Sequence, residues 1–319
     1  MRKIAFLIVL LAAAVSGYVF MPLSLPSTPF YFTLEQGSLR HAGVQMKKAG
    51  LLSNTLAFEI LGRIMGKASS IKAGSYEIDH PVTPLQLLSK ITGNDFTQSK
   101  VTFVEGMTFS EIRRMLGQDQ DVRHDAARLS DMELLSRIGS AAPSPEGLFF
   151  PDTYYFAKGQ SDLSILERAY NAMNKKLGRE WQGREKNLPL SDPYQALTLA
   201  SIVEKETGKE RSLVAAVFLN RLKIGMKLQT DPSVIYGLGS RFDGNLRKRD
   251  LLADQPYNTY TRAGLPPTPI SMPGLKSIDA VLHPAHSRAL YFVSRGDGTS
   301  QFSDSLEEHN RAVNRYQRK

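Results

Sequence analysis

At 319 residues, of which 42% are hydrophobic, the chain has enough apolar material for the cores of about two domains, which excludes disorder throughout. The sequence contains no cysteine, so disulfides, thiolate zinc sites, iron–sulfur clusters and a cysteine nucleophile are excluded. Its 40 basic and 31 acidic residues give a net charge of +9, which favours an anionic partner such as nucleic acid, lipid headgroups or an acidic polymer.

The N-terminus carries two basic residues and then an uncharged run from Ile4 to Leu34, whose most apolar part ends at Met21. Because a helix needs about 20 apolar residues to cross a bilayer, this run predicts a transmembrane anchor over residues 1–21. A cleaved signal peptide is the alternative, since Ala12–Ala14 offers a small-residue processing site. The basic start predicts a cytoplasmic N-terminus and export of the rest of the chain. Export makes a nucleic-acid partner unexpected.

Residues 22–30 contain three prolines and are predicted to form a stiff, extended stem. From Tyr31 onward one pattern recurs, at 31–52, 74–91 and 101–116: an extended piece, a turn with Gly or Pro, and a helix with apolar residues three and four apart. This pattern predicts a small α/β module. It leaves open whether the module is an ordinary small core or binds glycans.

A helix is best defined over residues 191–208, including its two capping ends. Asp192 suits the N-cap, Pro193 suits the first turn, and Gly208 suits a left-handed stop after the last turn. The sequence therefore predicts both ends of this helix.

Glu206 follows the apolar residues Leu199, Ile202 and Val203 by seven, four and three positions, which places its carboxyl group on the buried side of the helix. A carboxyl group among apolar neighbours has a raised pKa and can protonate a glycosidic oxygen. A salt-bridged carboxylate at a helix end fits the pattern equally well. Glu204 is rotated about 160° away, so we expect it to face solvent.

A second polar cluster consists of Gln229, Thr230 and Asp231, set between apolar residues. Its amide, hydroxyl and carboxyl groups suit sugar hydroxyls and amides. Asp231 is a candidate second carboxylate, and equally a candidate N-cap for a helix that begins at Pro232.

Aromatic and amide side chains gather at Tyr257 to Tyr260, just before the proline-rich stretch from Gly264 to Ile270. Aromatic rings provide flat faces for stacking on pyranose rings, and prolines stiffen the loop that carries them. This segment predicts a rigid binding loop.

Signals for other chemistry fail. His283 and His286 are separated by Pro284, so they do not form the HExxH helix of a zinc hydrolase. Ser201 lacks a nucleophile elbow, and Gly237–Gly239 lacks the third glycine of a nucleotide loop. We therefore predict no metal site and no cofactor.

Five longer motifs resemble those of the endolytic murein transglycosylases, the YceG-like family, and occur in the same order: Glu146–Tyr154, Ala200–Thr207, Leu228–Gly237, Tyr257–Tyr260 and Gly264–Pro267. Shorter matches at residues 72–76, 104–107 and 308–310 extend the resemblance over nearly all of the chain after the stem. The sequence departs from the family pattern at Thr268, where glycine is common, and at Ser300, where a histidine is expected. These departures leave the shape of the loop and the role of that histidine open.

The resemblance implies an α+β protein of the cell inner membrane with a single N-terminal transmembrane helix. Residues 31–98 would form a small LysM-like periplasmic subdomain, and residues 99–319 a larger periplasmic catalytic domain. The family's catalytic glutamate corresponds to Glu206, in agreement with the helical pattern. We expect the substrate to be bound by Gln229, Thr230, Asp231, Tyr236, Tyr257, Asn258 and Tyr260.

The implied substrate is the glycan strand of nascent peptidoglycan. A lytic transglycosylase needs one carboxyl group: it protonates the oxygen that leaves N-acetylmuramic acid, then takes a proton from the 6-hydroxyl of the same sugar, which closes a 1,6-anhydro ring. Such an enzyme would terminate glycan polymerisation, beside a peptidoglycan synthase. The alternatives are a non-catalytic peptidoglycan-binding scaffold and a muramidase that uses two carboxyl groups, Glu206 and Asp231.

Overall fold

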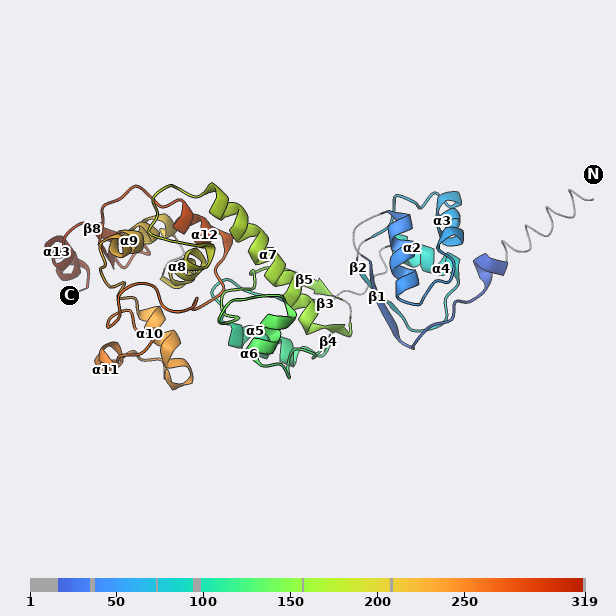
Figure 1. The fold of residues 1–319 in the computed structure, drawn as a ribbon, viewed down its shortest axis with the longest axis horizontal. Coiled ribbons are helices and arrows are strands. Elements are labelled where there is room, and N and C mark those ends of the chain that lie inside the picture. Colours follow the sequence, from blue (N-terminus) through green and yellow to red (C-terminus); the bar gives the residue numbers. More distant parts are fainter. Residues whose placement is uncertain are drawn as a thin grey trace, which may run out of the picture. The chain divides into compact units, whose positions relative to one another are not determined.

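The computed structural model describes residues 17–34, 38–72, 74–93, 99–156, 158–206 and 209–317 (Figure 1). The chain divides into two compact units. The N-terminal unit comprises the chain up to residue 101 with residues 119–124 and 154–162, and the C-terminal unit comprises residues 102–118, 125–153 and 163–319. Helices and small sheets occur in both, so the predicted α+β class is confirmed.

The N-terminal unit is built on strands β1 (Phe30–Leu34) and β2 (Gly74–Ile78), which pair antiparallel with Phe30 opposite Ile78. Helices α2 (Leu39–Lys48) and α3 (Thr55–Ile64) connect the strands, and α4 (Pro84–Thr92) follows β2. The stacked rings of Phe32 and Tyr76, with centroids 5.3 Å apart, lie in its core. This order agrees with the repeated strand-then-helix pattern, whereas the LysM-like identity of the unit stays a prediction.

Part of the predicted stem belongs to the N-terminal unit. Leu23 and Leu25 pack against its core, and the Leu23 N–H donates to the carbonyl of Val82 at 2.8 Å. Apolar side chains spaced between the prolines explain this packing, because prolines restrict the backbone without preventing burial. The predicted anchor falls largely on residues 1–16, outside the described ranges; within those ranges, no helix is both long and apolar enough to cross a membrane.

Short strands and helices follow. Strand β3 (Ser99–Thr102) pairs with β5 (Thr153–Phe156), and β4 (Val122–Arg123) pairs in parallel with β6 (Gln160–Ser161). The helices of this region are α5 (Phe109–Gln118), α6 (Asp131–Arg137) and the long α7 (Asp162–Gly183).

Helix α8 (Pro193–Glu206) is the central helix of the C-terminal unit, packed against α12 (Leu275–Leu282) and α9 (Arg211–Lys223) (Figure 1). Every residue from Ala196 to Val203 is buried, so protein covers the helix on all sides. The predicted N-cap is confirmed, because Asp192 Oδ1 accepts from the Gln195 N–H at 2.9 Å. Gly208, the predicted stop, lies outside the described residues.

The remaining elements of the C-terminal unit follow α9. They are α10 (Asp231–Leu238), the short 3-10 helix η1 (Gly239–Arg241), α11 (Lys248–Leu252), the antiparallel hairpin of β7 (Tyr291–Ser294) and β8 (Ser300–Ser303), and α13 (Leu306–Tyr316).

The prediction that Glu204 faces solvent is wrong. Its side chain is only 5% exposed and pairs with Arg211, with 2.9 Å between Oε1 and the guanidinium. Its other oxygen, Oε2, accepts from the Gly274 N–H at 2.9 Å and the Ser277 hydroxyl at 2.8 Å, at the N-terminus of α12. The unsatisfied N–H groups of that helix end and the arginine cover the polar side of α8. Glu204 therefore ties α8 to both of its neighbours.

A second buried carboxyl group, that of Glu146, joins three segments of the C-terminal unit. The Phe109 N–H at the start of α5 donates to both of its oxygens, at 3.0 and 3.2 Å, and the Tyr236 hydroxyl of α10 donates to Oε2 at 3.0 Å. The next residue, Gly147, has φ +81°, and a Cβ atom there would lie 2.4 Å from Pro269. Burial raises the pKa of Glu146 to about 7, against the opposing effect of these hydrogen bonds.

We expect Glu146→Gln to remove a pH dependence from the stability of the C-terminal unit. Because the folded-state pKa lies above the ordinary value, Glu146 contributes stability that is fully present below about pH 4.5 and is lost as the pH rises through 7. Between these limits the wild-type free energy of unfolding should fall relative to that of Glu146→Gln, by about 3 kcal/mol. Urea unfolding from pH 4.5 to 8 measures this difference.

The matched control is Glu307→Gln, whose side chain is 82% exposed and which should keep the wild-type pH dependence. Parallel curves for wild type and Glu146→Gln would show that the Glu146 carboxyl group has no raised pKa in the folded state.

Candidate active site

Glu206 is the last residue of α8, and its carboxyl group is largely enclosed by the protein. The Thr230 hydroxyl donates to its Oε1 in a short hydrogen bond. Burial raises the pKa of Glu206, and the negative charge of Asp231 raises it further, while the Thr230 hydrogen bond and the positive charge of Arg221 oppose this rise. A carboxyl group with a raised pKa keeps its proton to a higher pH than a free glutamic acid does, which suits a proton donor.

Thr230 is fixed by a network of buried hydroxyl groups. Its N–H donates to Thr259 Oγ1 at 3.0 Å, and its carbonyl accepts from the Ser233 hydroxyl at 2.8 Å. Ser233 and Thr259 are themselves linked, with 2.9 Å between their hydroxyl oxygens. The network joins the segment that carries Thr230 to the Tyr257–Tyr260 loop, so both segments are held in one arrangement at the end of α8.

Asp231 does not act as the N-cap of α10. The N-cap position belongs to Thr230, and the Asp231 carboxylate accepts a hydrogen bond of 2.6 Å from the Tyr260 hydroxyl. Burial and this acceptor raise the pKa of Tyr260, which keeps the phenol protonated and able to donate. Asp231 is exposed, so the site contains a second carboxylate near Glu206 in a very different environment.

Arg221, a buried arginine on α9, is a further member of the site that was not among the predicted residues. Its Nε donates to the Leu290 carbonyl and its Nη1 to the Leu228 carbonyl, both at 2.6 Å, and its guanidinium lies 5.3 Å from the ring centroid of Tyr291. The positive charge is therefore held in place, and it favours the ionised form of Glu206. The spacing that identified Glu206 would have identified it too, because Arg221 follows Val214, Val217 and Phe218 by seven, four and three residues.

Two of the predicted substrate contacts lie in another cluster. Tyr236 and Tyr257 pack edge to face, with centroids 4.9 Å apart; Tyr236 donates to Glu146, and the Tyr257 hydroxyl lies 2.9 Å from that of Thr268. The charges of Tyr257 and Glu146 raise the pKa of Tyr194, near the start of α8, in addition to the effect of burial. The hydroxyl groups of Tyr236 and Tyr257 thus contact Glu146 and Thr268, and not Glu206.

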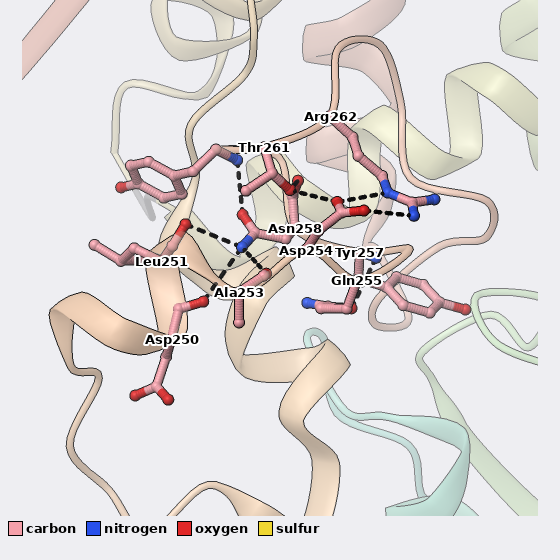
Figure 2. A network of polar contacts seen from close by, with 10 residues as sticks. Asp250, Leu251, Ala253, Asp254, Gln255, Tyr257, Asn258, Thr261 and Arg262 are labelled. Carbon is pink, nitrogen blue, oxygen red and sulfur yellow. Dashed lines mark hydrogen bonds and ion pairs between the residues drawn. The ribbon is translucent and has the colours of Figure 1, made fainter.

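Asn258 has a different role from the predicted one. It is fully buried, and its amide NH₂ donates to the carbonyls of Asp250, Leu251 and Ala253, at 3.2, 3.1 and 2.7 Å (Figure 2). Its Oδ1 accepts from the Tyr260 N–H at 2.9 Å. With these bonds the amide holds the loop that presents Tyr260, instead of facing a substrate.

The last predicted contact, Gln229, is exposed and has φ +49°, an uncommon value for a residue other than glycine. Its N–H donates to the Thr259 carbonyl at 3.1 Å, so the unusual backbone is supported by the same loop. Ser300, where the family pattern has histidine, lies in β8, and its N–H donates to Glu210 at 2.7 Å.

Comparison with known proteins agrees with the sequence motifs. The sequence profile of the YceG-like family matches residues 32–315. An endolytic murein transglycosylase of Bacillus subtilis is 30% identical over 290 residues, which are 85% of this chain and 80% of the relative. One of Streptococcus pneumoniae is 28% identical, over 97% of this chain and 63% of the relative.

A crystal structure of a YceG-like protein, lmo1499 of Listeria monocytogenes, superimposes with a TM-score of 0.54 at 28% sequence identity, covering 88% of this chain and 98% of that one. The predicted resemblance is therefore confirmed, and the chain belongs to the YceG-like family.

Proposed function

We propose that this protein is an endolytic peptidoglycan lytic transglycosylase, a lyase that cleaves the β-1,4 bond between N-acetylmuramic acid and N-acetylglucosamine within glycan strands. The observation that carries the proposal is the Glu206 carboxyl group, enclosed at the end of α8 and hydrogen-bonded by Thr230. The curated relatives named as endolytic murein transglycosylases support this reaction.

In the proposed mechanism, protonated Glu206 donates its proton to the glycosidic oxygen as the bond to the anomeric carbon breaks. The resulting carboxylate accepts the proton of the muramoyl 6-hydroxyl, whose oxygen forms the new bond to the anomeric carbon. The proton returns to Glu206, and no water is consumed. Thr230 and Arg221 stabilise the carboxylate between the two proton transfers, because both favour the ionised form.

A two-carboxylate muramidase is the second candidate, since Asp231 is close enough to affect the pKa of Glu206. Hydrolysis requires a second carboxyl group that acts as base or nucleophile at about 5 to 9.5 Å from the acid. In the structure the Asp231 carboxylate is engaged by Tyr260, which favours a role in shaping the site.

Glu206→Gln and Asp231→Asn distinguish the two reactions. Glu206→Gln keeps the shape of the side chain but removes both proton transfers, so release of anhydromuropeptides from purified sacculi should fall at least about 10²-fold while glycan binding persists. Asp231→Asn should retain much more activity than Glu206→Gln. Mass spectrometry of the released muropeptides, with circular dichroism to verify folding, measures both.

Equal and complete loss in the two folded variants, or reducing ends instead of anhydro ends from the wild type, would favour the muramidase. Undiminished activity of Glu206→Gln would exclude Glu206 as the acid. Binding without any product from the wild type would favour a non-catalytic scaffold.

If the protein terminates glycan strands beside a synthase, cells that carry only Glu206→Gln should contain longer glycan strands. Unchanged strand lengths, measured by chromatography, would contradict that role.

Thr230→Val should shift the pH dependence of the reaction. The Thr230 hydrogen bond lowers the pKa of Glu206, so its removal should raise that pKa. Since the reaction begins with protonated Glu206, the decline of kcat/KM at high pH should move to higher pH. The control is Thr261→Val, whose hydroxyl donates to Asp254 at 2.8 Å on the protein surface and which should leave the profile unchanged. An unshifted pH profile in Thr230→Val would show that the Thr230 hydroxyl does not affect the pKa of the catalytic acid.

We also propose that residues 1–21 anchor the protein in the inner membrane and leave the catalytic unit in the periplasm. The uncharged run after two basic residues supports this arrangement. N-terminal sequencing of protein extracted from membranes should find the segment intact. A mature chain that starts near Val15 would instead establish a cleaved signal peptide.

A further inference from the structure

Three side chains with metal-binding atoms meet between α7 and α12, in a cluster that the proposed mechanism does not use. They are Glu180 of α7 and Asp279 and His283 at the C-terminal end of α12, and their ligand atoms all lie within 4.8 Å of one another. Asp279 and His283 are four residues apart, which places them on one face of the helix. The His283 N–H donates to the Asp279 carbonyl at 2.7 Å, so the backbone of this last turn is ordered.

The chemistry of the cluster suits a divalent transition metal. Two carboxylate groups and an imidazole are common ligands of Zn²⁺, whose bonds to oxygen and nitrogen are about 2.0 to 2.2 Å long. Atoms bound to one such ion are about 3.3 Å apart, so small side-chain rotations bring the three groups to binding distance. Arg179 donates to Oε1 of Glu180, which leaves Oε2 for the metal. The negative end of the α12 dipole lies at His283 and also favours a cation.

A separate feature of the same region also favours a cation. Glu180 and Asp279 line a cavity of about 440 Å³ together with Glu105, Asp152 and Lys276. With the Arg179 guanidinium that pairs with Glu180, four carboxylates there face two cationic groups. A concave surface lined mainly by negative charge raises the local concentration of cations and provides a route to the cluster. The cavity and the cluster share two side chains and therefore form one continuous acidic surface.

We propose that Glu180, Asp279 and His283 bind one divalent transition-metal ion, Zn²⁺ by preference, with water completing its coordination. The ion has a structural role: it ties α7 to α12, the helix that packs against the Glu206 helix α8. The sequence contains no local signal for this site, because its ligands come from two helices separated by about a hundred residues.

The test is zinc binding by the full-length, untagged protein after treatment with a chelator. Calorimetric titration with ZnCl₂ near pH 7.5 should show one saturable site, and saturating Zn²⁺ should raise the thermal unfolding temperature. Asp279→Asn and His283→Ala should weaken binding at least tenfold and abolish the thermal shift. The matched control is His286→Ala, an exposed histidine three residues further on, which should bind like the wild type.

Absence of saturable binding by the wild type, or equal binding by His283→Ala, would overturn the proposal and leave an adventitious ion only. Co²⁺ substitution provides a measurement that needs no variant: the visible spectrum of the wild-type complex should indicate nitrogen and oxygen ligands in an ordered site, and a spectrum of aqueous Co²⁺ would contradict it. These measurements do not involve glycan cleavage, so their outcome is independent of whether the protein has the proposed transglycosylase activity.

Discussion

The C-terminal unit depends on the burial of α8, whose residues 196–203 are all buried. A carboxyl group that lies against such a buried stretch is not stabilised by solvent, so it needs a partner or must keep its proton. Glu204 has a full set of partners in Arg211, Gly274 and Ser277. Glu206, half a turn further on, has the Thr230 hydroxyl and the more distant charge of Arg221. The two carboxyl groups are chemically identical, and their surroundings alone make one a structural ion-pair partner and give the other the raised pKa on which the proposed proton transfer rests.

The position of Glu206 relative to its partners follows from a few buried hydroxyl groups. Thr230, Ser233 and Thr259 bind one another across two loops that are far apart in the sequence, and Asn258 holds the second loop by bonds to three carbonyls. Such bonds are directional and cost free energy when they are left unmade, so they define one arrangement of the loops. This explains why the polar segments at 229–231 and 257–260 accompany the glutamate helix: one provides the hydroxyl group, and the other holds it in place.

Glu146 performs a similar task elsewhere in the C-terminal unit, where it links α5 and Tyr236 beside the loop that begins at Gly264. Its burial favours the protonated form, which suits a group that connects packed segments without an ionic partner. The close approach of Gly147 to Pro269 brings this stiff loop against the carboxyl group. The hydroxyl of Thr268, where the family commonly has glycine, is used within the same cluster, as a partner of Tyr257. The motif from Glu146 to Tyr154 thus contributes to the architecture around the site more than to its chemistry.

The sequence alone determined the local features of this protein: the helix that Asp192 caps and that carries Glu206, the repeated strand-then-helix pattern, the α+β class and the family. Each of these follows from periodicity, capping residues or contiguous motifs, which are readable within about twenty residues. Only the tertiary structure decided what covers each polar side chain. Periodicity identified the apolar face of α8, but the partner of Glu204 comes from the start of α12, seventy residues later, so that residue was assigned wrongly to solvent. For the same reason the sequence does not show that Asn258 is buried, or that Glu180, Asp279 and His283 meet, because contacts between distant segments leave no local trace in one sequence.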